Sequence, residues 1–294
     1  MQIRVTVDVF SGRPNPSFIL EGPEADDLAA RLQPEAAVED ATPFRRVQSR
    51  LGYRGLVIEQ LRDPVEGLPA TARVAGGVVL GPERAYRPAD EFTEDFVCGS
   101  TGPLTKIRPK PELHEFLRGE IDRTREWLDQ KWRRPRPWPE RVTCRCAPLY
   151  EPDWWNDGWG GQRQPNNNCY NYATNYRSDT YAQPGLAAGQ MYGSITCADV
   201  LAAAVRDDLI DNPGADNRCP DEGHLVALVV GPGWDFHWYR KGRNGYWSHK
   251  PGGTEVTNID NSGALIADPR NADRGSYTDF CTFMTVMHGH IKIQ

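Results

Sequence analysis

Short apolar strand patterns separated by turn signals fill the chain from Gly223 onward, and this feature constrains the fold most. Asn244-Gly245 is a strong signal for a hairpin between two of these patterns. Strands that follow one another across short turns pair antiparallel. The C-terminal part is therefore predicted to hold an antiparallel sheet with strands at 223–230, 235–241, 246–250, 254–260 and 280–286.

The first part of the chain reads as a small α+β domain. Apolar residues alternate with polar ones over 3–9, which predicts a strand with one buried face. Pro23 suits the first turn of a helix whose apolar face carries Ala25, Leu28, Ala29 and Leu32. Further strands are expected at 55–61 and 73–80. No cluster of nucleophiles, carboxylates or metal ligands stands out here.

Charge and apolar spacing divide the α+β chain into three pieces, namely 1–105, 106–141 and 142–294. The middle piece is net positive, whereas the two flanking pieces are net negative. It carries apolar residues at helical spacing from Leu113 to Trp132, between Pro111 and Pro135, which predicts a connector helix.

Composition narrows the classes of partner. The formal net charge of −6 argues against binding of nucleic acid through its phosphates. The longest apolar runs are far too short to span a membrane. Both classes of partner are therefore not expected.

The start of the sequence and its cysteines bear on the compartment. Met1-Gln2-Ile3-Arg4 leads directly into a strand pattern, without the basic segment and apolar core of a signal peptide. A cytoplasmic protein is the default expectation, with export by a non-classical route as the alternative. Seven cysteines leave at least one thiol unpaired, and Cys197 and Cys219 could form a disulfide in an exported protein.

Cys169 is the best candidate for a nucleophile. It follows the polar run Asn166–Asn168 and begins a short predicted helix, whose unpaired N–H groups would stabilise a thiolate. Cys98 and Cys281 lie beside phenylalanines and are predicted to be packing thiols. Cys144-Arg145-Cys146 has no second pair of ligands at a zinc spacing, so neither a metal nor a cofactor is expected.

A histidine in the predicted sheet would serve as the base. If Val230 pairs with Asp235 across the loop, His237 lies opposite Leu228 and on the same face as His224. With a two-residue turn at Asn244-Gly245, His249 lies on the other face. In this flat register His224 and His237 are roughly 13 Å apart, so a twist, a bulge or another partner is needed to complete a site.

The order of a cysteine opening a helix and a later Gly223-His224-Leu225-Val226 strand resembles the papain-like superfamily. The NlpC-type and CHAP amidase and peptidase families are the most similar in style, over the C-terminal half alone. This resemblance implies Cys169 as nucleophile, His224 as base and His237 as orienting group.

A second mapping resembles the papain-type peptidases. It makes His237 the base, with Asn258 or Asp260 on a later strand behind it. Such enzymes keep a glutamine before the nucleophile as oxyanion donor, and Gln164 is the nearest candidate, with Gln162 behind it.

Two functions in different classes follow. One is a cysteine hydrolase or acyltransferase that cleaves amide bonds of a peptide, isopeptide or peptidoglycan-like substrate through an acyl-enzyme on Cys169. The other is a non-catalytic protein that binds a glycan or peptide through the aromatic, Asn-rich loop 153–176. Trp and Tyr rings stack on sugars, and Asn and Gln side chains suit sugar hydroxyls.

Overall fold

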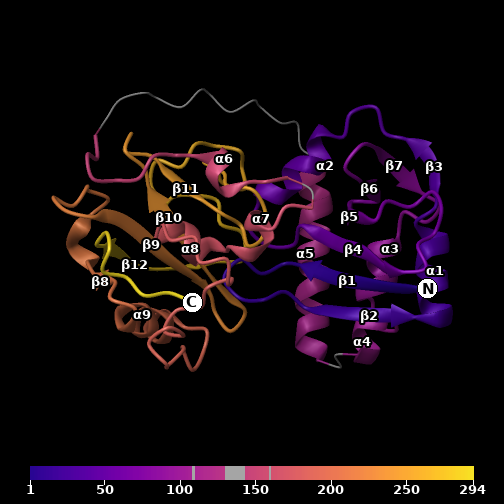
Figure 1. Cartoon of the computed structure of the whole chain (residues 1–294), viewed down its shortest axis with the longest axis horizontal. Helices are drawn as coiled ribbons and strands as arrows, with labels where there is room; N and C mark the ends of the chain where they lie inside the picture. The colour runs from indigo at the N-terminus through magenta and orange to yellow at the C-terminus, as the bar shows by residue number, and fades with distance from the viewer. Residues whose placement is uncertain (108–109, 130–142, 159) are drawn as a thin grey trace. The chain divides into compact units, whose positions relative to one another are not determined.

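The computed structural model describes residues 1–107, 110–129, 143–158 and 160–294 (Figure 1). The chain divides into two compact units, and each unit of the described chain contains one antiparallel sheet. The prediction of an α+β protein with an antiparallel C-terminal sheet is therefore confirmed. Unit 1 comprises Met1–Val9, Asn15–Gln48 and Gly52–Trp132, and unit 2 comprises Phe10–Pro14, Ser49–Leu51 and Arg133–Gln294.

The sheet of unit 1 has the strand order β2-β1-β4-β5-β6-β7-β3. The predicted alternation in β1 is confirmed as far as Val7, because Ile3, Val5 and Val7 are buried while Gln2, Arg4 and Thr6 are partly exposed. Asp8, predicted to face outward, is buried. The strands are β1 (Gln2–Asp8), β2 (Ser17–Glu21), β3 (Pro34–Ala37), β4 (Gly55–Arg62), β5 (Thr71–Ala75), β6 (Val78–Leu80) and β7 (Ala85–Pro88).

The single strand predicted at 73–80 is two strands. Gly76 and Gly77 both have positive φ angles, of 58° and 69°, and form the turn between β5 and β6. Glycine adopts this conformation without steric cost, so the chain reverses where the apolar pattern alone suggested continuity.

Helices pack against the sheet of unit 1, and the predicted first helix is confirmed. A helix also forms where the connector helix is predicted, but it belongs to unit 1. The side chain of Thr124, in α5, donates to the Tyr53 carbonyl over 2.9 Å. The predicted end of α5 near Trp132 lies outside the described residues. The helices are α1 (Gly22–Arg31), α2 (Thr42–Arg46), α3 (Thr93–Cys98), α4 (Pro103–Ile107) and α5 (Pro111–Leu128), with a 3-10 turn at Val47–Ser49.

The sheet of unit 2 has the strand order β11-β10-β9-β12-β8, with β9 at its centre. Every residue of β9 and β10 is buried. The strands are β8 (Ile210–Asp211), β9 (His224–Gly231), β10 (Asp235–Lys241), β11 (Trp247–His249) and β12 (Asp279–Val286).

One face of this sheet packs on α8 and α9, through a core that includes Val226, Leu228 and Trp238. The other face packs on the chain's later loops, through Ala227, Val229 and Tyr239. The helices of unit 2 are α6 (Pro152–Trp155), α7 (Arg163–Asn166), α8 (Cys169–Ala173) and α9 (Cys197–Arg206), with a 3-10 turn at Pro213–Ala215.

The strand predicted at 254–260 is wrong. This segment makes only isolated bridges, from Thr257 to His249 and from Ile259 to Leu265. Its last residue, Asp260, accepts backbone N–H groups of the following loop and so holds a turn instead of extending a strand.

None of the described helices is long and apolar enough to cross a lipid bilayer.

Candidate functional site

Cys169 is the first residue of α8, as the sequence predicts. Oδ1 of Asn168 accepts the N–H groups of Tyr170 and Asn171, over 3.0 and 3.2 Å. Oδ1 of Asn171 accepts the Asn168 N–H in return, over 3.1 Å. This reciprocal capping box is the local reason why the helix begins here.

The Cys169 thiol is completely buried and packs in the apolar core between α8 and the sheet. Burial raises the pKa of this thiol well above its usual value, and the nearby Asp235 carboxylate raises it further. A backbone hydrogen bond from Trp238 and the charge of Lys250 act in the opposite direction but do not prevail. Since α8 has only five residues, its dipole is small, and the thiol is neutral in this conformation.

His224 lies at the opposite end of α8 from Cys169. Its Nε2 donates to the carbonyl of Ala173, the last residue of α8, over 2.7 Å. Burial lowers the pKa of His224 to about 3, so the ring is neutral. The structure thus places His224 on the α8 side of the sheet, where its described hydrogen bond supports the helix end.

His237 lies on the face of the sheet away from α8, so the prediction that it shares a face with His224 is wrong. It pairs with Val229 and not with Leu228, which turns its side chain away from His224. In β11, His249 pairs with Tyr239 and so shares the face of His237. Nε2 of His237 lies 2.9 Å from Nδ1 of His249, and both rings contact Tyr239.

The carboxylate of Asp260 accepts hydrogen bonds from the backbone of the loop that follows it. Oδ1 accepts the Ser262 N–H over 2.9 Å and the Ala264 N–H over 3.0 Å, and Oδ2 accepts the Asp273 N–H over 2.9 Å. The backbone carbonyl of Asn258 accepts the Ile266 N–H. Among the described contacts, the residue that hydrogen-bonds to His237 and could orient it is therefore His249, and not Asn258 or Asp260.

The two glutamines before Cys169 lie at the start of α7. Gln162 precedes this helix and is exposed, whereas Gln164 lies within it. The carbonyl of Gln164 accepts Nζ of the buried Lys250 over 2.6 Å. Lys250 was not among the predicted site residues, because nothing in the sequence links it to residue 164.

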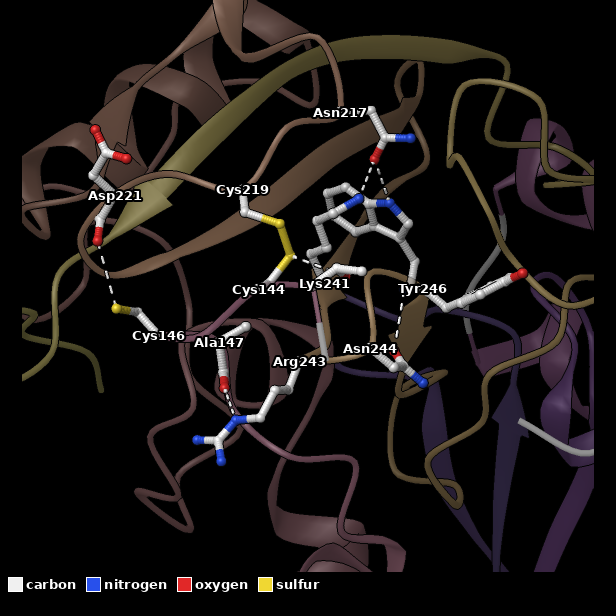
Figure 2. Close-up of a disulfide and its surroundings, with 12 residues drawn as sticks. Cys144, Cys146, Ala147, Asn217, Cys219, Asp221, Lys241, Arg243, Asn244 and Tyr246 are labelled. Atoms are coloured by element: carbon white, nitrogen blue, oxygen red, sulfur yellow. Dashed lines mark hydrogen bonds between the residues drawn. A yellow bond between two sulfur atoms is a disulfide. The ribbon is translucent and has the colours of Figure 1, made fainter. Parts of the chain in front are cut away.

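Two disulfides cross-link unit 2 among the described residues. One joins Cys144 to Cys219 (Figure 2) and the other joins Cys197 to Cys281, with Cα–Cα distances of 5.4 and 5.2 Å. The predicted pairing of Cys197 with Cys219 is wrong, and so is the prediction that Cys281 is a packing thiol.

Three thiols of the described chain stay free, and they differ in exposure. Cys98 and Cys169 are buried, whereas Cys146 is exposed. Figure 2 shows the Cys146 side chain directed at the carbonyl of Asp221, to which its sulfur donates over 3.5 Å.

The aromatic loop at 153–176 has a buried and an exposed part. Trp155 is buried and meets the Tyr172 ring edge-on, with centroids 5.2 Å apart. Trp154 and Tyr176 are 54% and 49% exposed. The guanidinium of Arg177 lies 4.2 Å from the centre of a Trp154 ring and donates to the Trp154 carbonyl over 3.1 Å, which holds the exposed indole in place. Trp159 lies outside the described residues.

Within the described ranges, no group of three or more His, Cys, Asp or Glu side chains is arranged to hold a metal ion.

Comparison with known proteins gives one informative relative. The chain matches no family model, and no solved structure matches it. It is 48% identical to insoluble matrix shell protein 1 of Ruditapes philippinarum over 143 residues, which are 48% of this chain and 91% of the relative.

This relative overturns the prediction of a cytoplasmic protein. It is a protein of the shell matrix, and the two disulfides of unit 2 are of the kind that persists in oxidising compartments. The likeness extends over nearly the whole relative, and the chain belongs to the family of insoluble matrix shell protein 1.

Proposed function

We propose that this protein is a secreted component of an insoluble extracellular matrix, where it binds matrix polymer and does not act as an enzyme. The observation that carries the proposal is the 48% identity to a protein named for the insoluble matrix of a shell. Identity at this level over 91% of the relative favours a shared role.

The cross-links of unit 2 support an extracellular role. The disulfides close stretches with sequence separations of 75 and 84 residues. Disulfides that close loops of this size stabilise a fold by roughly 2–4 kcal/mol each, mainly by restricting the unfolded chain. A protein held in a matrix outside the cell benefits from such stability.

The exposed rings of Trp154 and Tyr176 are the surface that we assign to polymer binding. Large aromatic side chains exposed to solvent carry much of the energy in recognition surfaces. The Arg177 guanidinium stacks against Trp154 and restricts its motion, which lowers the side-chain entropy lost on binding. A glycan or an extended peptide would contact these rings.

Co-sedimentation with the insoluble organic residue of demineralised clam shell tests this function. We expect the wild-type protein to sediment with the residue, and Trp154→Ala with Tyr176→Ala to weaken binding about tenfold or more. Phe92→Ala, which removes a ring that is 59% exposed in unit 1, is the matched control and should bind as the wild type does. Failure of the wild type to sediment, or equal binding by the double variant, would contradict the proposal.

A second candidate is a cysteine hydrolase or acyltransferase of amide bonds with a papain-like site in unit 2. It is favoured by the backbone hydrogen bond that Cys169 receives from Trp238, the residue after His237, and by the His237–His249 pair. In this mechanism a base removes the thiol proton, the sulfur attacks the amide carbonyl, the C–N bond breaks, and the leaving amine takes up the proton. His237, oriented by His249, is the candidate base, but it lies on the sheet face opposite the core that holds Cys169, so it would have to rearrange to reach the sulfur. The buried thiol would have to become accessible first.

Capture of the acyl-enzyme distinguishes this candidate from the first. The protein is incubated with activated peptide esters, and intact mass is measured. The second candidate requires an adduct that Cys169→Ala abolishes, that Cys146→Ala leaves in place and that His237→Ala slows. Adducts on Cys146 alone would reject it.

A further inference from the structure

A turn from the N-terminal part of the sequence docks on unit 2. Phe10–Pro14 belongs to this unit, although β1 and β2 on either side of it belong to unit 1. The buried carboxylate of Asp235 accepts three successive backbone N–H groups of the turn. They come from Ser11, Gly12 and Arg13, over 2.5, 3.2 and 3.1 Å.

The Gly12 carbonyl of the same turn accepts two hydrogen bonds from side chains. Nδ2 of Asn168 and Nε2 of Gln183 both donate to the Gly12 carbonyl, each over 2.8 Å. Both amide side chains are buried, and Tyr192 fixes Gln183 by donating to its Oε1 over 2.8 Å. Acceptors for the N–H groups and donors for the C=O together recognise a peptide backbone in one orientation.

Gly12 is required for this approach. A Cβ atom at this position would lie 2.3 Å from a ring carbon of Phe236 and 2.6 Å from the Phe236 carbonyl oxygen. Any side chain at position 12 would therefore push the turn off the start of β10.

Several groups that contact the turn also lie near Cys169. Asn168 immediately precedes this cysteine, and Phe236 belongs with Cys169 to the same buried core. The phenol of Tyr192 and the carboxylate of Asp235 are close enough to interact electrostatically with the sulfur. Tyr192 also interacts electrostatically with Arg13 of the turn. The docked turn is therefore held by the residue next to Cys169 in the chain and lies against Phe236, which packs in the same core as the sulfur.

We propose that the Ser11–Arg13 turn is a removable cover over the Cys169 thiol, and that Asp235, Asn168 and Gln183 form the peptide-binding site on which it docks. The turn occupies this site in cis, in the way that a substrate backbone would occupy it in trans. If the second candidate function holds, the contact is autoinhibitory. Protection of Cys169 by the turn does not depend on any enzymatic turnover. An experiment can therefore reject the cover without rejecting the second candidate function, and the reverse.

The three free cysteines allow a test by alkylation and mass spectrometry. Iodoacetamide should label the exposed Cys146 quickly in the wild type, while Cys169 and Cys98 stay protected. In Gly12→Ala the turn cannot dock, and we expect Cys169 to react at least about tenfold faster with Cys98 unchanged. Gly214→Ala is the matched control, because a Cβ there meets nothing within 4 Å.

Asp235→Asn is the second variant, since it keeps the shape of the side chain but weakens the acceptor of the three N–H groups. Selective acceleration at Cys169 in either variant supports the proposal. Labelling of Cys169 at the wild-type rate in both variants would overturn it. Equal acceleration of Cys169 and Cys98 in both variants would overturn it as well, because it would mean general unfolding and not the loss of a cover.

Discussion

Nε2 of His237 lies 2.9 Å from Nδ1 of His249, and the pair fixes its own proton arrangement. Nε2 of His249 lies 3.0 Å from the carbonyl of Ile259, which can only accept, so this nitrogen carries a proton. In the neutral ring Nδ1 of His249 is then an acceptor, and His237 must donate from Nε2. The lone pair of His237 is thereby assigned to its Nδ1 atom.

Removal of the His249 ring should destabilise unit 2. In His249→Ala the buried Nε2–H of His237 and the carbonyl of Ile259 both lose their described partner, which costs roughly 1–3 kcal/mol for each group. His249→Asn keeps an acceptor near the position of Nδ1 and should recover part of the loss. The free energy of unfolding of unit 2, followed by the fluorescence of its tryptophans in urea, measures both. Equal stability of His249→Ala and wild type would contradict the assigned network.

The sequence predicted the strands that carry these histidines but not their faces. The bounds of β10, Asp235–Lys241, agree with the prediction. The error arose in the turns, because Gly231 pairs with Asp235 and Lys241 with Trp247. Each pairing differs by one residue from the expected one, and a shift of one residue moves a side chain to the other face. Apolar alternation could not reveal this, since both faces of β9 and β10 are buried.

The stability of unit 2 should fall in weak acid because of His224. Its pKa is about 3 in the folded protein against 6.5 for the ordinary side chain, so the unfolded chain binds the proton more readily. The contribution is complete above about pH 6.5 and is lost as pH falls towards 3, by up to about 1.4 kcal/mol per pH unit. His224→Gln retains a donor for the Ala173 carbonyl and removes the titration. Urea unfolding between pH 7 and 4 should therefore show a smaller decline in this variant, and an identical slope would contradict the assignment.

Opening the disulfides should lower stability without abolishing the sheet. The double variant Cys197→Ser with Cys281→Ser releases a loop of sequence separation 84 and should cost about 2–5 kcal/mol. Non-reducing peptide mapping should recover the 144–219 and 197–281 links in the wild type. A recovered 197–219 link would contradict the pairing of Cys197 with Cys281.

The contacts of Asp235 illustrate what a single sequence cannot provide. This carboxylate binds the Ser11 N–H group 224 positions away, and neither residue carries a pattern that marks the other. The helix start at Cys169 was predictable because the polar run before it is local, and the structure shows that Asn168 of this run caps the helix. Local patterns thus located the Cys169 helix start, whereas its surroundings required the fold.

Unit 1 allows a buried ion cluster to be compared with a more exposed ion pair. Asp8 is buried and accepts Nη2 of Arg54 over 2.6 Å and Nη1 of Arg73 over 2.7 Å. Burial alone would raise the pKa of Asp8, but the two guanidinium groups outweigh it and lower the pKa to about 2. The stabilisation is therefore present above about pH 3.8 and is lost as pH falls towards 2.

Asp8→Asn should leave two buried guanidinium groups without a carboxylate and cost about 3–5 kcal/mol. Glu59→Gln, which removes the carboxylate of the more exposed Arg4–Glu59 pair, should cost less than about 1 kcal/mol. Because a chain of two units need not unfold in one step, hydrogen exchange of the β1 and β4 amides is the appropriate measurement. Faster exchange confined to these strands in Asp8→Asn at pH 7 would agree with the cluster. Comparable effects of the two substitutions would show that the buried carboxylate contributes no more than an exposed one.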